Sequence, residues 1–308
     1  MRNLIVTLSI LICSAVSAQE LPGFSMYLQN DFILNPAIAG TKSFVPVSVS
    51  HRSQWTNFSN APTTQLASVH GGVNGKAGVG LALINHTAGP TGMMSAQFSY
   101  SYRVKLTEKL KFSFGLAPMI IQHSVNKNKI SLDEQNDNTF NRMSNKTITA
   151  DLNTGFYLYS TNYYVGLSVL QVAGNKLRSG DDLFREQLKR HYLLQAGIDR
   201  AIGEKYILTP SLLVKCIESG APVQFDVNIK ATYNKLFWGG LSYRFSGSSA
   251  FNESAIVFIG VTKNNFSFGY SYDYNFGSIG QFSSGSHELF LCYRIPYQLN
   301  KEITEPAK

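Results

Sequence analysis

Beyond its first 18 residues, the sequence has no hydrophobic run long enough to cross a bilayer as a helix. It also has few segments with the hydrophobic period of an amphipathic helix. The first absence excludes a helical membrane protein. The second leaves almost no helices that could cover one face of a soluble sheet.

Cysteine is also scarce. The chain has three cysteines, and one of them, Cys13, lies within the first 18 residues. The other two, Cys216 and Cys292, could form one bridge, but their separation defines no disulfide framework. We therefore interpret them as small apolar residues.

Charge is sparse as well, at 15% of residues. The balance of 27 Lys and Arg against 19 Asp and Glu gives +8, and no basic run gathers this excess in one place. Such a balance indicates contact with anionic lipid headgroups or with an acidic partner, and it argues against nucleic acid as a partner of an exported chain.

Signals of catalysis are weak. The glycine-rich stretch 75–80 resembles a phosphate loop, but it lies in a tight turn with no helix after it. The histidines are dispersed, which argues against a metal site. A barrel hydrolase with His287 as base and Ser283, Ser284 or Ser286 as nucleophile is an alternative, although no signature selects a nucleophile. We predict rim residues in a loop, no enzyme activity and no cofactor.

The first 18 residues have the pattern of a secretory signal peptide. Arg2 precedes an apolar run, and the segment ends in the small residues Val16, Ser17 and Ala18. We therefore expect an exported protein whose mature chain begins near Gln19.

What the sequence does have is alternation. From Phe266 to Tyr274, five aromatic residues alternate with Ser, Gly, Ser and Asp, which is the period of a strand with one apolar and one polar face. Similar patterns predict about fourteen strands, near 45–52, 63–71, 78–84, 93–104, 110–122, 149–159, 163–170, 192–201, 206–215, 224–233, 237–245, 255–262, 266–274 and 288–295. A soluble β-sandwich would also alternate in this way.

The lengths of the connections favour a membrane barrel. Short, turn-like connections follow the even-numbered strands and longer ones follow the odd-numbered strands, as in outer-membrane barrels with periplasmic turns and extracellular loops. The long set includes 85–92, and residues 181–190 have the composition of a short helix. The fold class is therefore all-β, a transmembrane antiparallel β-barrel of about 14 strands in the cell outer membrane.

The chain divides into four parts. We predict a signal peptide at 1–18, a periplasmic N-terminal arm at 19–42, the barrel at 43–295 and a periplasmic tail at 296–308. The even number of strands places both the arm and the tail in the periplasm. Asn35 and Pro36 predict a bend before the first strand, either a plain turn or a docking or plug element, and Gly40 would let the chain enter the wall.

Barrel closure brings the two ends of the strand order together. The last strand pairs with the first, so Arg52, Gln54 and Trp55 should lie near Gly285, Ser286, His287 and Glu288 at the outer mouth. Alternation turns Arg52 and Glu288 into the lumen, where we expect them to meet. Their pairing would be either an ion pair that closes the seam or part of a partner-binding rim.

Several of these residues carry a family resemblance. Tyr27, the Asn35-Pro36-Ala37 bend with Gly40, Arg52 with Gln54-Trp55, and Pro62 resemble the start of the PorP/SprF family of type IX secretion proteins in Bacteroidetes. The resemblance continues through Asp151 with Gly155, Tyr164–Ser168, Tyr270–Asp273 and Gly285–Glu288, in the same order.

The resemblance implies an outer-membrane barrel of the type IX secretion and gliding machinery that docks or anchors exported partner proteins. Implied partners are outer-membrane lipids together with either periplasmic lipoprotein and ring components or one large surface adhesin. The family offers no catalytic residues to transfer. The alternative is a porin or transporter for a small or apolar solute, since a barrel of this size can hold a channel.

Overall fold

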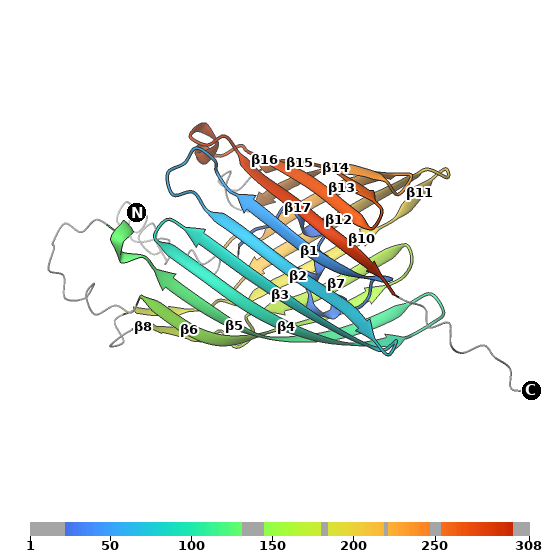
Figure 1. The fold of residues 1–308 in the computed structure, drawn as a ribbon, viewed down its shortest axis with the longest axis horizontal. Coiled ribbons are helices and arrows are strands. Elements are labelled where there is room, and N and C mark those ends of the chain that lie inside the picture. The colour runs from blue at the N-terminus through green and yellow to red at the C-terminus, as the bar shows by residue number, and fades with distance from the viewer. Residues whose placement is uncertain (1–21, 131–144, 180–183, 219–220, 247–253, 298–308) are drawn as a thin grey trace, which may run out of the picture.

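Fourteen antiparallel strands form a closed barrel, in which β1 pairs with β17 and each other strand pairs with its neighbour along the chain (Figure 1). The computed structural model describes residues 22–130, 145–179, 184–218, 221–246 and 254–297. The segments β10 and β11 both pair with β12 and act as one strand, so the fifteen segments of this sheet make fourteen strands. The predicted signal peptide and most of the predicted tail lie outside the described residues.

The strands of the barrel are β1 (Phe44–Ser53), β2 (Thr63–Val73), β3 (Ala77–Ala88), β4 (Thr91–Lys105), β5 (Lys111–Val125), β6 (Lys146–Tyr159), β7 (Tyr163–Leu170), β10 (His191–Ile198), β11 (Arg200–Ile202), β12 (Tyr206–Ile217), β13 (Gln224–Tyr233), β14 (Phe237–Ser246), β15 (Ser254–Lys263), β16 (Phe266–Asn275) and β17 (Ser286–Pro296). In the described ranges, no helix is long and apolar enough to span a membrane.

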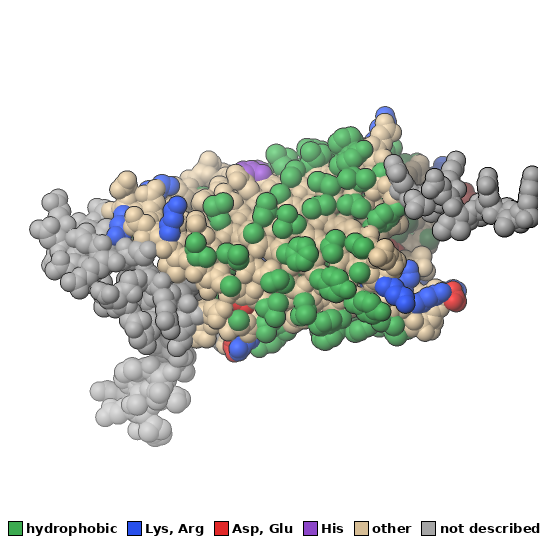
Figure 2. Space-filling view, turned by 60° about the horizontal axis from the view of Figure 1, so that its bottom comes forward, with side chains coloured by type: hydrophobic (Ala, Val, Ile, Leu, Met, Phe, Trp, Pro, Cys, Tyr) green, Lys and Arg blue, Asp and Glu red, His purple; other side chains and the backbone are tan. Residues whose placement is uncertain are grey.

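The alternation of the sequence sorts side chains between the two faces of the wall. In β16, Phe266 and Phe268 face outward and are about half exposed, whereas Ser267, Ser271 and Asp273 face the lumen and are buried. On the face shown in Figure 2, the outward hydrophobic side chains form a band across the barrel that lies nearer the end with the short turns. We assign this band to the lipid and the short turns to the periplasm.

Most of the predicted connections are found, but two differ. β3 and β4 extend through most of 85–92, which was predicted as a long loop. A tight hairpin at Gly89 and Pro90 joins them, because cross-strand pairing continues to Ala88 and Thr91.

The helix predicted at 181–190 is also wrong. The connection between β7 and β10 instead contains a short β-hairpin of β8 (Lys176–Ser179) and β9 (Phe184–Gln187), and β9 lies within the range predicted as helix. An isolated short helix is marginal in water, whereas the hairpin pairs backbone groups between its strands.

The N-terminal segment lies inside the barrel, which corrects the prediction of a periplasmic arm. Residues 22–43, called the arm from here on, contain three 3₁₀ turns, η1 (Met26–Leu28), η2 (Asp31–Ile33) and η3 (Pro36–Ile38). Their side chains are largely buried against the inner wall. The even number of strands determines only that β1 begins at the periplasmic end. It does not determine the path of the residues before β1, and these turn back into the lumen.

Candidate functional site

Glycines of the inner wall make room for one half of the arm. Gly78, Gly115 and Gly155 face the lumen, and a Cβ at any of them would overlap an atom of Ala39, Ala37 or Asn35, respectively. A Cβ at Gly80 would lie 2.6 Å from the ring of Phe32. The wall of β3, β5 and β6 therefore fits closely against the backbone and side chains of the arm, and we call these four glycines the glycine seat.

The predicted bend at Asn35 and Pro36 is where the arm meets the barrel backbone. The Asn35 amide group donates to the carbonyl oxygens of Phe156 and Leu167 at 3.0 and 3.3 Å. Its Oδ1 accepts from the backbone N–H of Ala37 at 2.9 Å and so caps η3, whose first residue is Pro36. Of the two interpretations left open by the sequence, the bend has the contacts of a plug element.

Gly40 ends the buried part of the arm. Its φ of +68° favours glycine, and a side chain there would meet the backbone of Gly71 and Gly72. Its N–H donates to Nδ1 of His70 at 3.1 Å, and its carbonyl accepts from the guanidinium of Arg103. The chain therefore leaves the lumen through a fixed turn and enters β1, as the sequence suggested.

Charged residues hold the other end of the arm. Arg52 and Glu288 face one another across the β1–β17 pair, with 3.5 Å between nitrogen and oxygen, as the register predicted. Arg52 also contacts Asp273 of β16 at 2.6 Å, and all three side chains are at most 2% exposed. The hydroxyl of Ser25 lies between Arg52 and Asp273, and Glu288 accepts from the backbone N–H of Ser25 at 2.7 Å. We call Arg52, Asp273 and Glu288 the clasp.

A second ion pair lies farther around the lumen. Asp226 of β13 binds the guanidinium of Arg244 of β14 through both carboxylate oxygens, at 3.0–3.2 Å. Nearby, the hydroxyl of Tyr27 donates to Asn228 at 3.0 Å. Burial raises the pKa of Tyr27 well above its usual range, so the phenol remains a neutral donor.

The remaining predicted rim residues join two loops at the outer mouth. The backbone N–H of Trp55 donates to the Ser286 hydroxyl at 3.1 Å, and the next N–H, that of Thr56, donates to the carbonyl of Gly285 at 2.8 Å. Gln54 closes its own loop through a hydrogen bond from its N–H to the carbonyl of Pro62. The structure therefore brings the two predicted segments together. Arg52 and Glu288, however, are buried between the barrel wall and the arm and are not exposed at the rim.

His287 faces away from this cluster. Its Nδ1 lies 2.6 Å from the hydroxyl of Tyr270, and its ring packs against Tyr272 on the outer face. Ser286 faces the lumen and is buried. Since neighbouring residues of a strand point to opposite faces, His287 and Ser286 do not form the base and nucleophile pair considered from the sequence.

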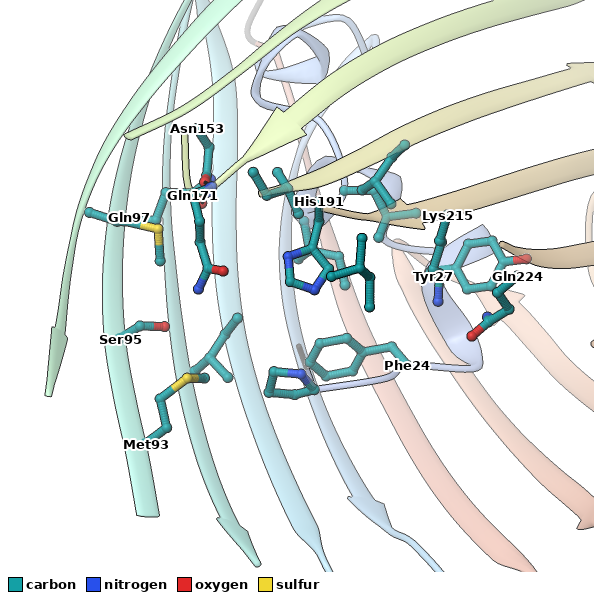
Figure 3. A pocket seen from close by; sticks show the side chains of 18 of the residues that line it. Phe24, Tyr27, Met93, Ser95, Gln97, Asn153, Gln171, His191, Lys215 and Gln224 are labelled. Carbon is teal, nitrogen blue, oxygen red and sulfur yellow. Dashed lines mark hydrogen bonds between the residues drawn. The ribbon is translucent and has the colours of Figure 1, made fainter. Parts of the chain in front are cut away.

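Above the arm, the lumen opens toward the long loops as a cavity of about 330 Å³ (Figure 3). Phe24 and Tyr27 of the arm lie at its floor. Its wall is mostly apolar, with polar side chains between the apolar ones. The apolar lining includes Ile33, Leu34, Ile84, Met93, Met119, Ile121, Leu170 and Leu193, and the polar lining includes Ser95, Gln97, Asn153, Gln171, His191, Lys215 and Gln224. We call it the outer cavity.

The outer cavity contains polar atoms that could bind a ligand. The Nε2 atom of His191 is buried and has no hydrogen-bond partner among the described residues, while its Nδ1 lies 2.9 Å from the carbonyl oxygen of Lys189. The amide of Asn153 donates to Gln97 at 2.6 Å, so this part of the wall is fixed. The arrangement suits an apolar group with one or two hydrogen-bonding atoms.

Sequence reasoning did not assign Asp273, Asp226 or Arg244 to the site, although Asp273 lies in a stretch of family resemblance, and it missed the whole outer cavity. Asp273 had a visible signal, because it ends the polar face of β16, beside the strand that carries Glu288. The cavity had none, since its walls come from many strands and its floor from an arm that was expected elsewhere.

The chain resembles solved outer-membrane channels in fold. The toluene transporter TbuX of Ralstonia pickettii aligns with a TM-score of 0.51 and 9% identity over 87% of this chain and 93% of that one. The CymD monoaromatic hydrocarbon channel gives 0.53 and 9% over 87% and 93%. A FadL homologue of Pseudomonas aeruginosa gives 0.51 and 9% over 86% and 93%. At these identities the likeness concerns the fold alone.

Sequence comparison identifies the family. No curated protein matches the chain in a sequence search. The family model described as type IX secretion system membrane protein PorP/SprF matches residues 16–293, which is most of the 308-residue chain. The protein is an outer-membrane β-barrel and belongs to the PorP/SprF family of type IX secretion system membrane proteins.

Proposed function

We propose that this barrel docks or anchors an exported protein at the cell surface and does not conduct it through the lumen. The observation that supports this most is the arm, which lies across the lumen between the outer cavity and the periplasmic end. Its backbone lies on the glycine seat and its first residues bind the clasp. A segment that enters from outside would meet Phe24 and Tyr27 and stop there.

The outer cavity suits an apolar segment of such a partner. Leu170, Leu193 and Ile121 offer apolar contact, while His191 and the nearby amides can bind backbone groups of a peptide. The partner would be a large surface adhesin or another exported protein. Periplasmic lipoprotein and ring components of the machinery would bind at the opposite end.

A matched pair of substitutions tests docking. Met93 lines the outer cavity, whereas the adjacent Met94 points to the outer wall and is 56% exposed. We expect Met93→Gln combined with Leu193→Asn to release the exported partner from cells into the medium, and to lose it from the barrel purified in mild detergent. Met94→Gln should behave like the wild type. Retention of the partner by the cavity variant would contradict the proposal.

Transport of a small apolar solute is the second candidate. The apolar lining of the outer cavity favours it, and the structural neighbours include channels whose names state hydrocarbons as their cargo. Planar bilayers separate the two functions. A plugged anchor should be silent until residues 24–39 are deleted, whereas a transporter should show solute-dependent conductance with its arm intact.

A further inference from the structure

A second cavity lies on the periplasmic side of the arm. It has a volume of about 270 Å³ and is lined on one side by Tyr157, Tyr159 and Tyr164 and on another by Asn228 and Lys230. Tyr157 stacks on Tyr159 and packs against Tyr164, with ring centroids 5.2 and 5.8 Å apart. We call it the inner cavity. The inference that follows rests on the proposed function, which has periplasmic components of the machinery bind at this end of the barrel.

The inner cavity presents a cation without an ion-pair partner. Lys230 follows Asp226 and Asn228 on the lumen face of β13, and in the described part of the chain no carboxylate lies within 4.0 Å of its ammonium group. The two carboxylates of the cavity have other partners. Asp31 binds Lys42 at 2.7 Å, and Asp199 accepts from Thr209 at 2.6 Å.

A buried amide adds a second donor. Gln195 is 6% exposed and lines the same cavity, and its Nε2 has no hydrogen-bond partner among the described residues. A buried donor without a partner is costly, so a ligand that accepts from it gains affinity. An ammonium and an amide N–H in one cavity suit a carboxylate.

The basic character continues onto the surface around the cavity. All the short turns except 160–162 contain or directly adjoin an exposed lysine, namely Lys76, Lys105, Lys109, Lys111, Lys205, Lys235 and Lys263. The turns of Lys205 and Lys235 are joined by a hydrogen bond from the N–H of Asn234 to the carbonyl of Lys205. The described acidic residues at this end are Glu108, Glu204 and Asp199, fewer than the seven lysines, so the field of the rim is positive.

We propose that the inner cavity and its basic rim bind an acidic, carboxylate-bearing segment of a periplasmic protein. The cavity lies inside the barrel wall, so the lipids around the barrel do not face it. The positive charge extends from Lys230 across several turns, which fits an extended chain with repeated carboxylates better than a single small anion. The tyrosine rings supply apolar contact for the backbone and stems of such a segment.

Binding of defined peptides tests this proposal. The full chain in phosphatidylcholine nanodiscs would be titrated into rhodamine-labelled hexaglutamate, with hexaglutamine as the neutral probe, and fluorescence anisotropy followed. We expect the glutamate peptide to bind and the glutamine peptide not to bind. Lys230→Gln should weaken binding about tenfold or more, the loss expected for a charge-assisted hydrogen bond. Rising salt should weaken it further.

Two further variants keep the test decisive. Lys205→Gln with Lys235→Gln changes exposed turns, so the barrel should fold, and binding should weaken about twofold to fivefold. Lys129→Gln, at the opposite end in η4 (Lys127–Lys129), should have no effect. Equal binding of hexaglutamine overturns the proposal, as does unchanged binding by folded Lys230→Gln. Displacement of the peptide by soluble glycerol phosphate, added to the phosphatidylcholine nanodiscs at matched ionic strength, would overturn the proposal in favour of a phosphate headgroup.

Discussion

Ser25 and Met26, at one end of the arm, bind the charged clasp of β1, β16 and β17. The stretch from Phe32 to Ala39, at the other end, lies against the glycine seat of β3, β5 and β6. The clasp holds its end through ion pairs and hydrogen bonds, and the seat holds the other end through close packing of the arm on the glycines of the wall. Water or a ligand can replace the polar contacts of the clasp with other hydrogen bonds, whereas neither can replace the close packing at the seat. We therefore expect the clasp end to release first when a partner binds in the outer cavity.

The clasp should give the largest effect. Arg52→Ala leaves Asp273 and Glu288 buried without their cation, and removal of one partner of a buried pair costs about 3–5 kcal/mol. Urea unfolding of the refolded barrel would measure this loss. The triple variant Arg52→Met, Asp273→Asn and Glu288→Gln removes all three charges and should regain most of the stability. Failure of the triple variant to regain any would contradict an electrostatic clasp.

The seat should respond to size and not to charge. Gly115→Val places a side chain where the backbone of Ala37 lies, and overpacking of this kind costs about 1–3 kcal/mol or expels the arm. Urea unfolding would measure this cost. Trp238 packs in the same cluster as Met26 at the clasp end, so in a Trp55→Phe background its fluorescence would report whether the whole arm is expelled. Gly23→Ala, with nothing within 4 Å, is the matched control. Wild-type stability together with an unchanged Trp238 signal in Gly115→Val would disprove the fit.

Asn35 connects the arm to the wall beside the seat. Asn35→Ala removes its bonds to Phe156, Leu167 and Ala37, and should cost about 1–3 kcal/mol in the same unfolding assay. Asn35→Ser retains the cap of η3 but loses the two bonds to the wall, so it separates the two contributions. If serine restores full stability, the cap alone matters.

Tyr27 should give the smallest effect. Tyr27→Phe removes the hydrogen bond to Asn228 and should cost about 0.5–1.5 kcal/mol. Burial raises the pKa of Tyr27, so the folded state retains the proton after the unfolded chain begins to lose it. The stabilisation is therefore complete below the ordinary tyrosine pKa, about 10, and declines above it. The stability difference between wild type and Tyr27→Phe, measured from pH 8 to 11, should shrink above about pH 10.

The barrel could be predicted from sequence because its signal is local. Alternation in segments such as Phe266–Tyr274 fixes which residues face lipid, and closure then places Arg52 beside Glu288. The location of the arm could not be predicted in this way. Its contacts join residues more than 240 positions apart, as between Ser25 and Asp273, and short 3₁₀ turns have no periodic signal. Inward glycines such as Gly115 were the available clue, since small residues on a polar face leave space for another chain segment.

The position of the arm also constrains the order of assembly. The clasp draws on β1, β16 and β17, so it is complete only after the last strands have been added to the sheet. Because Glu288 binds a residue 263 positions earlier, closing that loop has a large entropic cost that is recovered only at the end. We expect arm docking to coincide with barrel closure, so that a bound arm distinguishes a finished molecule from an incompletely assembled one.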